Sequence, residues 1–205
     1  MEKKGKIRQI RAVETRKRIV AAAKKLIAEN GFENVSIEDI AKEAEVSTGS
    51  FYTYFKRKED IVEELNQQDF YRLAETVNEM AELELSDRLK YYCRGFLVEI
   101  ERVGIEICRQ WIRNNITPIN MEISEKKTTK YVHDDLAMKS LLEEGIRRGE
   151  LTADTPVAEM ALFLNTQLYG LMVVWCMTDA VLIGSDKIDA FFELVVKQAL
   201  MPYRK

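Results

Sequence analysis

Apolar residues recur at helical spacing along most of the chain, and the clearest case lies between residues 35 and 58. One stripe there occupies positions i, i+3, i+4 and i+7, namely Ile37, Ile40, Ala41 and Ala44. This spacing predicts a short amphipathic helix. The run Glu45-Val46-Ser47 interrupts it, and Thr48 to Phe55 predicts a second short helix. The stretch therefore predicts two helices joined by a three-residue turn.

Both predicted helices begin beside a residue that can cap them. Ser36-Ile37-Glu38-Asp39 has the form of a capping box, with Asp in place of the usual Glu or Gln. Ser47 precedes the second helix, which starts with small polar residues, continues with aromatic ones and is closed by Lys56-Arg57-Lys58. A small, polar helix start can approach a nucleic acid closely, while hydroxyl groups and lysines can hold phosphates.

Residues 14–65 resemble the DNA-binding domain of the TetR (tetracycline-repressor) family. The family pattern A-A-x-x-L-x-x-x-x-G-[FY] is matched by AAKKLIAENGF, and the pattern around the two short helices is matched by VSIEDIAKEAEVSTGSFYTYF. One position departs from the pattern, because Glu45 stands where the family most often has Gly. If the turn needs a positive φ there, a residue other than Gly costs on the order of 1 kcal/mol.

The resemblance implies that the second short helix approaches base edges in the major groove and that residues around it hold phosphates. The residues implied in DNA contact are Ser36, Ser47, Thr48, Gly49, Ser50, Tyr52, Thr53, Tyr54 and Lys58. Phe51 and Phe55 are expected to plug the core between the helices instead. This stretch offers no arginine fork for guanine, so we expect apolar contacts and DNA shape to contribute to specificity.

The amino-terminal end is basic, since residues 1–18 hold eight Lys and Arg against two Glu. Two interpretations stay open: a solvated, disordered tail, or an arm that follows the DNA backbone or enters the minor groove. Residues 1–60 carry 14 Lys and Arg against 10 Asp and Glu, whereas the remainder carries 17 against 24. A basic end on an acidic body favours a local nucleic-acid face.

The rest of the chain predicts helices, because period-2 apolar runs are few and there are only three Pro and nine Gly. Longer helices are expected over residues 13–30, 58–85, 87–103, 105–116, 123–148, 156–177 and 186–200. The fold class that follows, together with the resemblance, is all-α with about nine helices. It places a basic arm and a three-helix helix-turn-helix domain in residues 1–57, and a larger helical domain for effector binding and dimerisation in residues 58–205.

Aromatic and soft side chains recur in the larger domain and suit an apolar, amphipathic or planar ligand. The candidate pocket residues are Phe70, Tyr92, Phe96, Cys108, Trp111, Met138, Tyr169 and Met172. For each residue alone, ordinary core packing is the alternative interpretation. The resemblance implies a small-molecule effector in this domain but does not identify it.

The last two predicted helices are apolar on nearly all sides, and such helices must be buried. The resemblance implies that they pack against their copies in a homodimer through Leu164, Leu168, Leu171, Trp175, Phe191, Phe192 and Val195. Such an interface should bury well above ~1,200 Å². Two recognition helices would then lie roughly 34–36 Å apart and read an inverted-repeat operator.

Enzyme classes find no support in the sequence. His133 is the single histidine, and no phosphate loop, dinucleotide fingerprint or nucleophile elbow is present. Cys93, Cys108 and Cys176 fit neither a disulfide framework nor a zinc site, which leaves buried thiols or, as the alternative, redox sensors. We expect no cofactor, no metal, no signal peptide and no membrane span, and a cytoplasmic protein.

The leading hypothesis is a homodimeric, sequence-specific DNA-binding repressor that a small molecule releases from a palindromic operator. A constitutive DNA-binding or tethering factor without an effector is the first alternative. A ligand-binding protein or enzyme with a vestigial DNA-binding head is the second.

Overall fold

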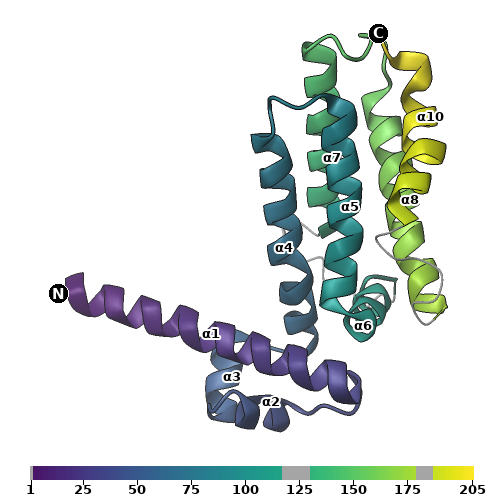
Figure 1. The fold of residues 1–205 in the computed structure, drawn as a ribbon. Coiled ribbons are helices and arrows are strands. Elements are labelled where there is room, and N and C mark those ends of the chain that lie inside the picture. Colours follow the sequence, from purple (N-terminus) through teal and green to yellow (C-terminus); the bar gives the residue numbers. More distant parts are fainter. Residues whose placement is uncertain (1, 117–129, 179–186) are drawn as a thin grey trace. The chain divides into compact units, whose positions relative to one another are not determined.

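The computed structural model describes residues 2–116, 130–178 and 187–205, with side chains described for residues 9–65 and from residue 71 onward within these ranges. Every regular element in these ranges is a helix, which confirms the expected all-α fold class. The chain divides into two compact units (Figure 1). Unit 1 comprises residues 1–66 and 106–119, and unit 2 comprises residues 67–105 and 120–205.

Unit 1 contains three amino-terminal helices and parts of two others. They are α1 (Glu2–Asn30), α2 (Ile37–Glu43), α3 (Thr48–Tyr54), the first turns of α4 (Glu59–Glu79) and all but the first residue of α6 (Ile105–Ile116). Apolar side chains from the first four form its core: Ile19, Ala23, Ile27, Ile40, Ala41, Phe51 and Ile61. Removing each large side chain of this kind from water stabilises the fold by about 1.5–3 kcal/mol. This packing holds α2 and α3 against α1.

Helix α1 is longer than the sequence predicted, because it begins at Glu2 and not at Val13. Residues 2–12 are mostly Lys, Arg, Gln, Ile and Ala, which favour a helix. The structure therefore describes the backbone of the basic end as helical, whereas one of the two interpretations expected a disordered tail. The side chains of Lys3, Lys4, Lys6 and Arg8 lie outside the described residues.

Unit 2 is built from long helices that run side by side (Figure 1). They are the remainder of α4, α5 (Leu85–Val103), α7 (Lys130–Arg147), α8 (Val157–Met177) and a carboxyl-terminal rod. The rod consists of α9 (Ile188–Phe191), a π-helical segment (Phe192–Val196), α10 (Lys197–Leu200) and a 3-10 turn (Met201–Tyr203). Counted as one, the rod brings the described helices to nine, as expected.

The end of α4 differs from the prediction, since the helix stops at Glu79 and not near Leu85. Arg148 Nη1 donates to Ala81 O at 2.8 Å and to Leu83 O at 2.9 Å. These bonds hold residues 80–84 as a turn, and Leu85 begins α5. The predicted start of α7 at residue 123 lies outside the described residues.

Glycine allows helices of unit 2 to approach closely. A Cβ atom at Gly95 would lie 2.4 Å from Leu73 Cδ1, and one at Gly145 would lie 2.4 Å from Leu85 Cδ2. Real Cβ atoms do not come so near to other heavy atoms, so these positions need glycine unless the leucines move. The contacts fix α4 on α5 and α5 on α7, around a core that includes Leu89, Leu142 and Leu164.

Candidate functional site

The start of α2 is fixed by the capping box that the sequence predicted. Ser36 Oγ accepts a hydrogen bond from Asp39 N at 3.1 Å, and Asp39 Oδ2 accepts one from Ser36 N at 3.0 Å. The bonds from the Ser36 hydroxyl and backbone lower the pKa of Asp39. The Ser36 hydroxyl thus has a local structural role, and its predicted phosphate contact stays a prediction.

The turn between α2 and α3 takes the strained conformation that the Glu45 position suggested. Glu45 has φ +52°, in the left-handed region that favours glycine. From α1, Arg18 donates to both carbonyls of the turn, with Nε 3.1 Å from Ala44 O and Nη2 2.9 Å from Glu45 O. A charged clamp therefore holds the turn although it lacks the usual glycine.

Helix α3 presents small polar residues at its exposed start and buries aromatic ones. Ser47 Oγ accepts from Ser50 N at 3.0 Å and caps the helix, as predicted. Around exposed Gly49, only Ser47 Oγ comes within 4 Å of an added Cβ, so a ligand surface can approach this backbone. Phe51 is fully buried and Phe55 nearly so, which confirms their expected core role.

The polar side chains along α3 are placed differently from one another. Tyr52 is 53% exposed and its hydroxyl can reach solvent or a ligand, whereas Tyr54 is half-buried. Thr53 Oγ1 donates to Gly49 O at 3.2 Å within the helix. Half-buried Thr48 and Ser50 lie in the first turn. The DNA roles predicted for these residues remain predictions.

Lys58 has a structural role that the sequence did not reveal. Its ammonium group donates to Phe32 O at 2.6 Å and to Val35 O at 2.7 Å, and lies 4.1 Å from the centre of the Phe32 ring. It therefore ties the connection between α1 and α2 to the start of α4. The predicted phosphate contact would have to use the third N–H of this ammonium group.

A shallow groove in unit 1 brings several predicted residues together. It is lined by Val35, Ser36, Ile37, Glu38, Tyr52, Lys56, Arg57, Lys58 and Glu59. Lys56 and Arg57 are exposed there and were not among the predicted contacts. The basic run Lys56-Arg57-Lys58 was the sequence signal that could have identified them. The groove combines a hydroxyl, a phenol and basic groups. All of these can donate hydrogen bonds to phosphate oxygens.

The predicted pocket residues do not form one group in the structure. Tyr92, Phe96, Met138 and Met172 are buried in unit 2, and Tyr169 is half-buried there. Cys108 and Trp111 are buried residues of α6 and belong to unit 1. The side chain of Phe70 lies outside the described residues. The effector pocket stays a prediction.

Two of these aromatic residues belong to a buried set of polar side chains, here called the Lys130 cluster. Its members are Lys130, Asp134, Tyr92 and Tyr169. Lys130 donates to Asp134 Oδ2 and, at 3.0 Å, to the Tyr169 hydroxyl. Tyr169 also donates to Asp134 Oδ2 at 2.8 Å, and Tyr92 forms a side-chain hydrogen bond with Asp134. Lys130 and Asp134 are each only 1% exposed.

The charges of this cluster shape its ionisation. Burial alone would raise the pKa of Asp134, but the positive charge of Lys130 and the hydrogen bonds outweigh it, so the pKa is lowered. Burial and the neighbouring carboxylate raise the pKa of both Tyr92 and Tyr169. The cluster is therefore an ion pair with two neutral phenols.

Burial raises the pKa of the neighbouring Cys93 to about 12. This disfavours a thiolate and hence redox sensing at that residue.

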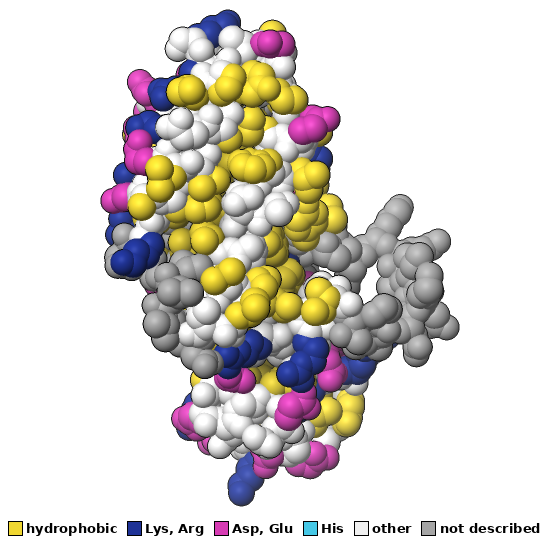
Figure 2. Space-filling model, turned by 90° about the vertical axis from the view of Figure 1, so that its right-hand side faces the viewer, with side chains coloured by type: hydrophobic (Ala, Val, Ile, Leu, Met, Phe, Trp, Pro, Cys, Tyr) yellow, Lys and Arg dark blue, Asp and Glu magenta, His cyan; other side chains and the backbone are white. Residues whose placement is uncertain are grey.

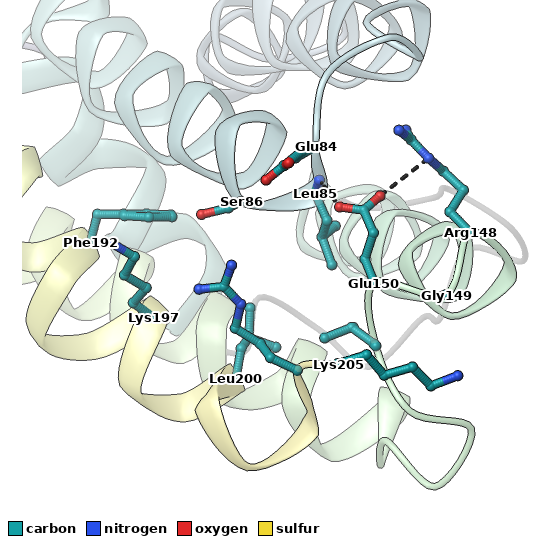
Figure 3. Close-up of a pocket in the computed structure, with 12 residues that line it drawn as sticks. Glu84, Leu85, Ser86, Arg148, Gly149, Glu150, Phe192, Lys197, Leu200 and Lys205 are labelled. Atoms are coloured by element: carbon teal, nitrogen blue, oxygen red, sulfur yellow. Dashed lines mark hydrogen bonds and ion pairs between the residues drawn. The ribbon is translucent and has the colours of Figure 1, made fainter.

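A separate cavity of about 470 Å³ lies in unit 2, where the start of α5, the α7–α8 connection and the carboxyl-terminal residues meet (Figure 3). None of the predicted pocket residues lines it. Glu150 projects into this region, accepts from Leu85 N at 2.5 Å and pairs with Arg148 Nε at 3.2 Å. These bonds join the α7–α8 connection to the first residue of α5.

The predicted dimer residues on α8 and the carboxyl-terminal rod differ in how far they are buried. Leu164, Leu168, Trp175 and Phe192 are buried against their own chain, and Leu171, Phe191 and Val195 are half-buried. Because α8 is apolar on all sides, the sequence could not distinguish its core face from its outer face. The exposed apolar residues are Leu162, Phe163, Val173, Val174, Met177, Leu194 and Met201. Figure 2 shows hydrophobic side chains over much of this side of the molecule.

Comparisons with known proteins agree with the geometry of unit 1. Residues 19–65 match the family model described as bacterial regulatory proteins, tetR family. The transcriptional repressor AcnR of Corynebacterium efficiens is 27% identical over 163 residues, which cover 77% of this chain and 80% of AcnR. The fatty acid metabolism regulator protein of Bacillus subtilis is 41% identical over 61 residues, which cover 30% of this chain and 31% of that protein.

Solved structures share the fold over most of the chain. FadR of Bacillus halodurans, a fatty acid degradation regulator, aligns with a TM-score of 0.70 at 20% identity and covers 87% of this chain and 96% of its own. FadR of Bacillus subtilis, solved in complex with stearoyl-CoA, aligns with a TM-score of 0.68 at 24% identity over 87% and 96%. At this level of identity the likeness establishes the fold alone.

Proposed function

We propose that this chain, whose residues 19–65 match the tetR family of bacterial regulatory proteins, is a homodimeric, cytoplasmic repressor. In this proposal it binds a palindromic operator and leaves it when a small molecule binds unit 2. The observation that carries the DNA-binding part is the placement of α3. Phe51 and Phe55 anchor one side of the helix in the core, and the small polar residues at its start stand at the surface. A rigidly held helix start of this kind is suited to enter a major groove.

The environment of α3 supports the same role. The groove with Tyr52, Lys56 and Arg57 adds hydroxyl and cationic groups next to the reading helix. Such groups set register on the phosphate backbone, while short hydroxyls such as Ser50 address base edges. We propose that the predicted contact residues act in these two groups.

The homodimer is supported by the outer face of α8. Phe163, Thr166, Gly170, Val173 and Met177 are exposed and recur at alternating steps of three and four residues. This is the spacing of a helix–helix seam. An added Cβ at Gly170 would meet nothing within 4 Å, so another helix can approach closely there. These residues replace the buried ones first expected at the interface.

A substitution on this face tests the dimer. Val173→Asp places a charge at the centre of the proposed seam and should convert the dimer to a monomer with unchanged helicity. Sedimentation or light scattering measures the mass, and Glu159→Ala on the same helix serves as a control. A wild-type protein that is monomeric at micromolar concentration contradicts the homodimer.

The DNA-binding part is tested by selecting bound sequences from a random duplex library with the purified protein. An inverted repeat should emerge, with half-sites about one helical turn apart. Tyr52→Ala should weaken binding to all sequences, whereas Ser50→Ala should change base preference more than affinity. Equal losses on all sequences for both variants would refute this division of roles.

The effector-free alternative is favoured by one observation. Met138 and Leu142 are fully buried in unit 2, and the hollow beside Met172 and Trp175 holds only about 10 Å³. A screen of small molecules for release of the selected operator separates the two functions. Release by a class of compounds supports the repressor, and retention with every compound that binds the protein supports the constitutive factor.

A further inference from the structure

We propose that the Lys130 cluster is a binding site for an organic amine, and that the ammonium group of Lys130 occupies the position that the ligand's ammonium group would take. The inference deepens the proposed function, on which it rests in taking this amine as the effector. All the residues involved belong to unit 2.

The surroundings of the Lys130 ammonium have the chemistry of an amine receptor. The ammonium donates to the Asp134 carboxylate and to the Tyr169 hydroxyl. It also lies 4.5 Å from the centre of the Phe96 ring and 4.7 Å from that of Tyr169. Tyr131 packs its edge against Tyr169, with ring centres 5.5 Å apart. A carboxylate combined with aromatic faces is the arrangement by which proteins recognise organic ammonium ions.

The stability of the fold does not by itself explain a buried lysine at this place. Burial of both partners adds a desolvation penalty, and well-packed apolar residues commonly replace such pairs without loss of stability. The cluster therefore points to recognition more than to support of the fold.

The cation is the exchangeable half of this pair. Asp134 carries the shorter side chain, and Lys130, Tyr169 and Tyr92 all hold it. Lys130 reaches the site through four methylene groups that can rotate. A free amine can therefore take the place of the lysine ammonium while the carboxylate and the aromatic rings stay in position. The volume released is that of a butylammonium chain.

Polar capacity remains beside the pair. Asp134 Oδ1 is buried and has no hydrogen-bond partner among the described residues, and His133 Nδ1 is 3.7 Å away. Asn165 lies one turn before Tyr169 on α8, is 1% exposed, and neither of its amide atoms is hydrogen-bonded within the described part of the chain. The ligand that fits this chemistry is a primary amine on a short apolar chain.

The test is chemical rescue of Lys130→Ala in the full chain by butylammonium chloride. Thermal unfolding of the variant is followed with butylammonium chloride. The controls are 1-butanol, sodium butyrate and sodium chloride at the same concentrations. At ten times its Kd, butylammonium should raise the melting temperature of Lys130→Ala by about 3 °C, because a ligand that binds only the folded state stabilises it. Butanol, butyrate and sodium chloride should raise it far less.

Lys139→Ala is the matched control, because Lys139 pairs with Asp135 at 2.6 Å on the outer side of the same helix. Its melting temperature should not respond to butylammonium beyond the response to sodium chloride. If Lys130→Ala does not fold, Lys130→Met keeps the length of the side chain without its charge, and calorimetric titration of the wild-type protein measures the weaker, competitive binding of the amine. Equal shifts in the Lys130 and Lys139 variants, or a larger shift with butyrate, would overturn the proposal.

Operator binding is measured separately, so that failures of the two proposals can be distinguished. Amine binding with loss of operator supports both. Amine binding with the operator retained supports the site and contradicts its role as the effector site. Operator binding without any amine binding overturns the site and leaves the proposed repressor intact.

Discussion

Both units use charged side chains to hold backbone carbonyls at helix connections, but unit 2 also buries an ion pair in its core. In unit 1, Arg18 and Lys58 bind backbone carbonyls at helix connections, close to the surface. In unit 2, Lys130 and Asp134 form an ion pair inside the core. The first arrangement fixes the backbone that carries the reading helix. The second places costly charges where aromatic residues enclose them, which is a feature of recognition sites.

Breaking the buried pair should have the largest effect. Asp134→Ala leaves the Lys130 charge buried without its partner and should lower the free energy of unfolding by about 3–5 kcal/mol. Asp135→Ala breaks a partly exposed pair on the same helix and should cost at most about 1 kcal/mol. Urea unfolding measures both. Similar losses for the two variants would contradict the distinction between the buried pair and the partly exposed pair.

The same pair should make stability depend on acid. The pKa of Asp134 is lowered in the folded chain, so its contribution is present above the unfolded value of about 3.9 and is lost as pH falls below it. Wild-type protein should therefore lose more unfolding free energy between about pH 5 and about pH 3 than Asp134→Asn does. Parallel pH profiles for the two proteins would show that this carboxylate is not held as described.

Removing the charge of Lys58 in unit 1 should have an intermediate effect on stability. Lys58→Met removes two charge-assisted bonds to Phe32 O and Val35 O and should cost about 1–3 kcal/mol. Lys56→Met, at an exposed neighbour, should change stability by about 0.5 kcal/mol or less and weaken operator binding. Chemical denaturation and operator titration together separate structural from DNA-binding lysines. Unchanged stability in Lys58→Met would show that the two bonds of Lys58 do not stabilise the fold.

The smallest expected effect is at the turn. Glu45→Gly should stabilise the fold by about 1 kcal/mol, because Glu45 has φ +52° and glycine tolerates this conformation. Glu43→Gly, within α2, should instead destabilise by about 1 kcal/mol. Thermal unfolding of the two variants gives the comparison, and a loss of stability in Glu45→Gly would contradict strain at this residue.

The sequence predicted unit 1 better than unit 2, for a physical reason. Helix caps, turn glycines and small apolar residues leave local signals, so the capping roles of Ser36 and Ser47 and the core role of Phe51 were predicted and confirmed. The structural role of Lys58 was missed because the two carbonyl groups that it binds belong to residues 23 and 26 positions away in the sequence.

Residues of unit 2 depend on long-range packing. From its neighbours in the sequence, Lys130 would be expected to lie in solvent. It is buried because α7 packs against α5 and α8. The uniform apolarity of α8 gave no information about which face lies inward, and the predicted interface therefore included buried residues such as Leu164.

Competition binding measures whether α3 in unit 1 reads a specific DNA sequence. The operator obtained by selection is titrated by fluorescence anisotropy beside a shuffled duplex of the same composition, at several salt concentrations. We expect at least about a 10³-fold preference for the operator, with affinity for both duplexes falling steeply as salt rises. Equal affinity for the two duplexes at every salt concentration would contradict this expectation.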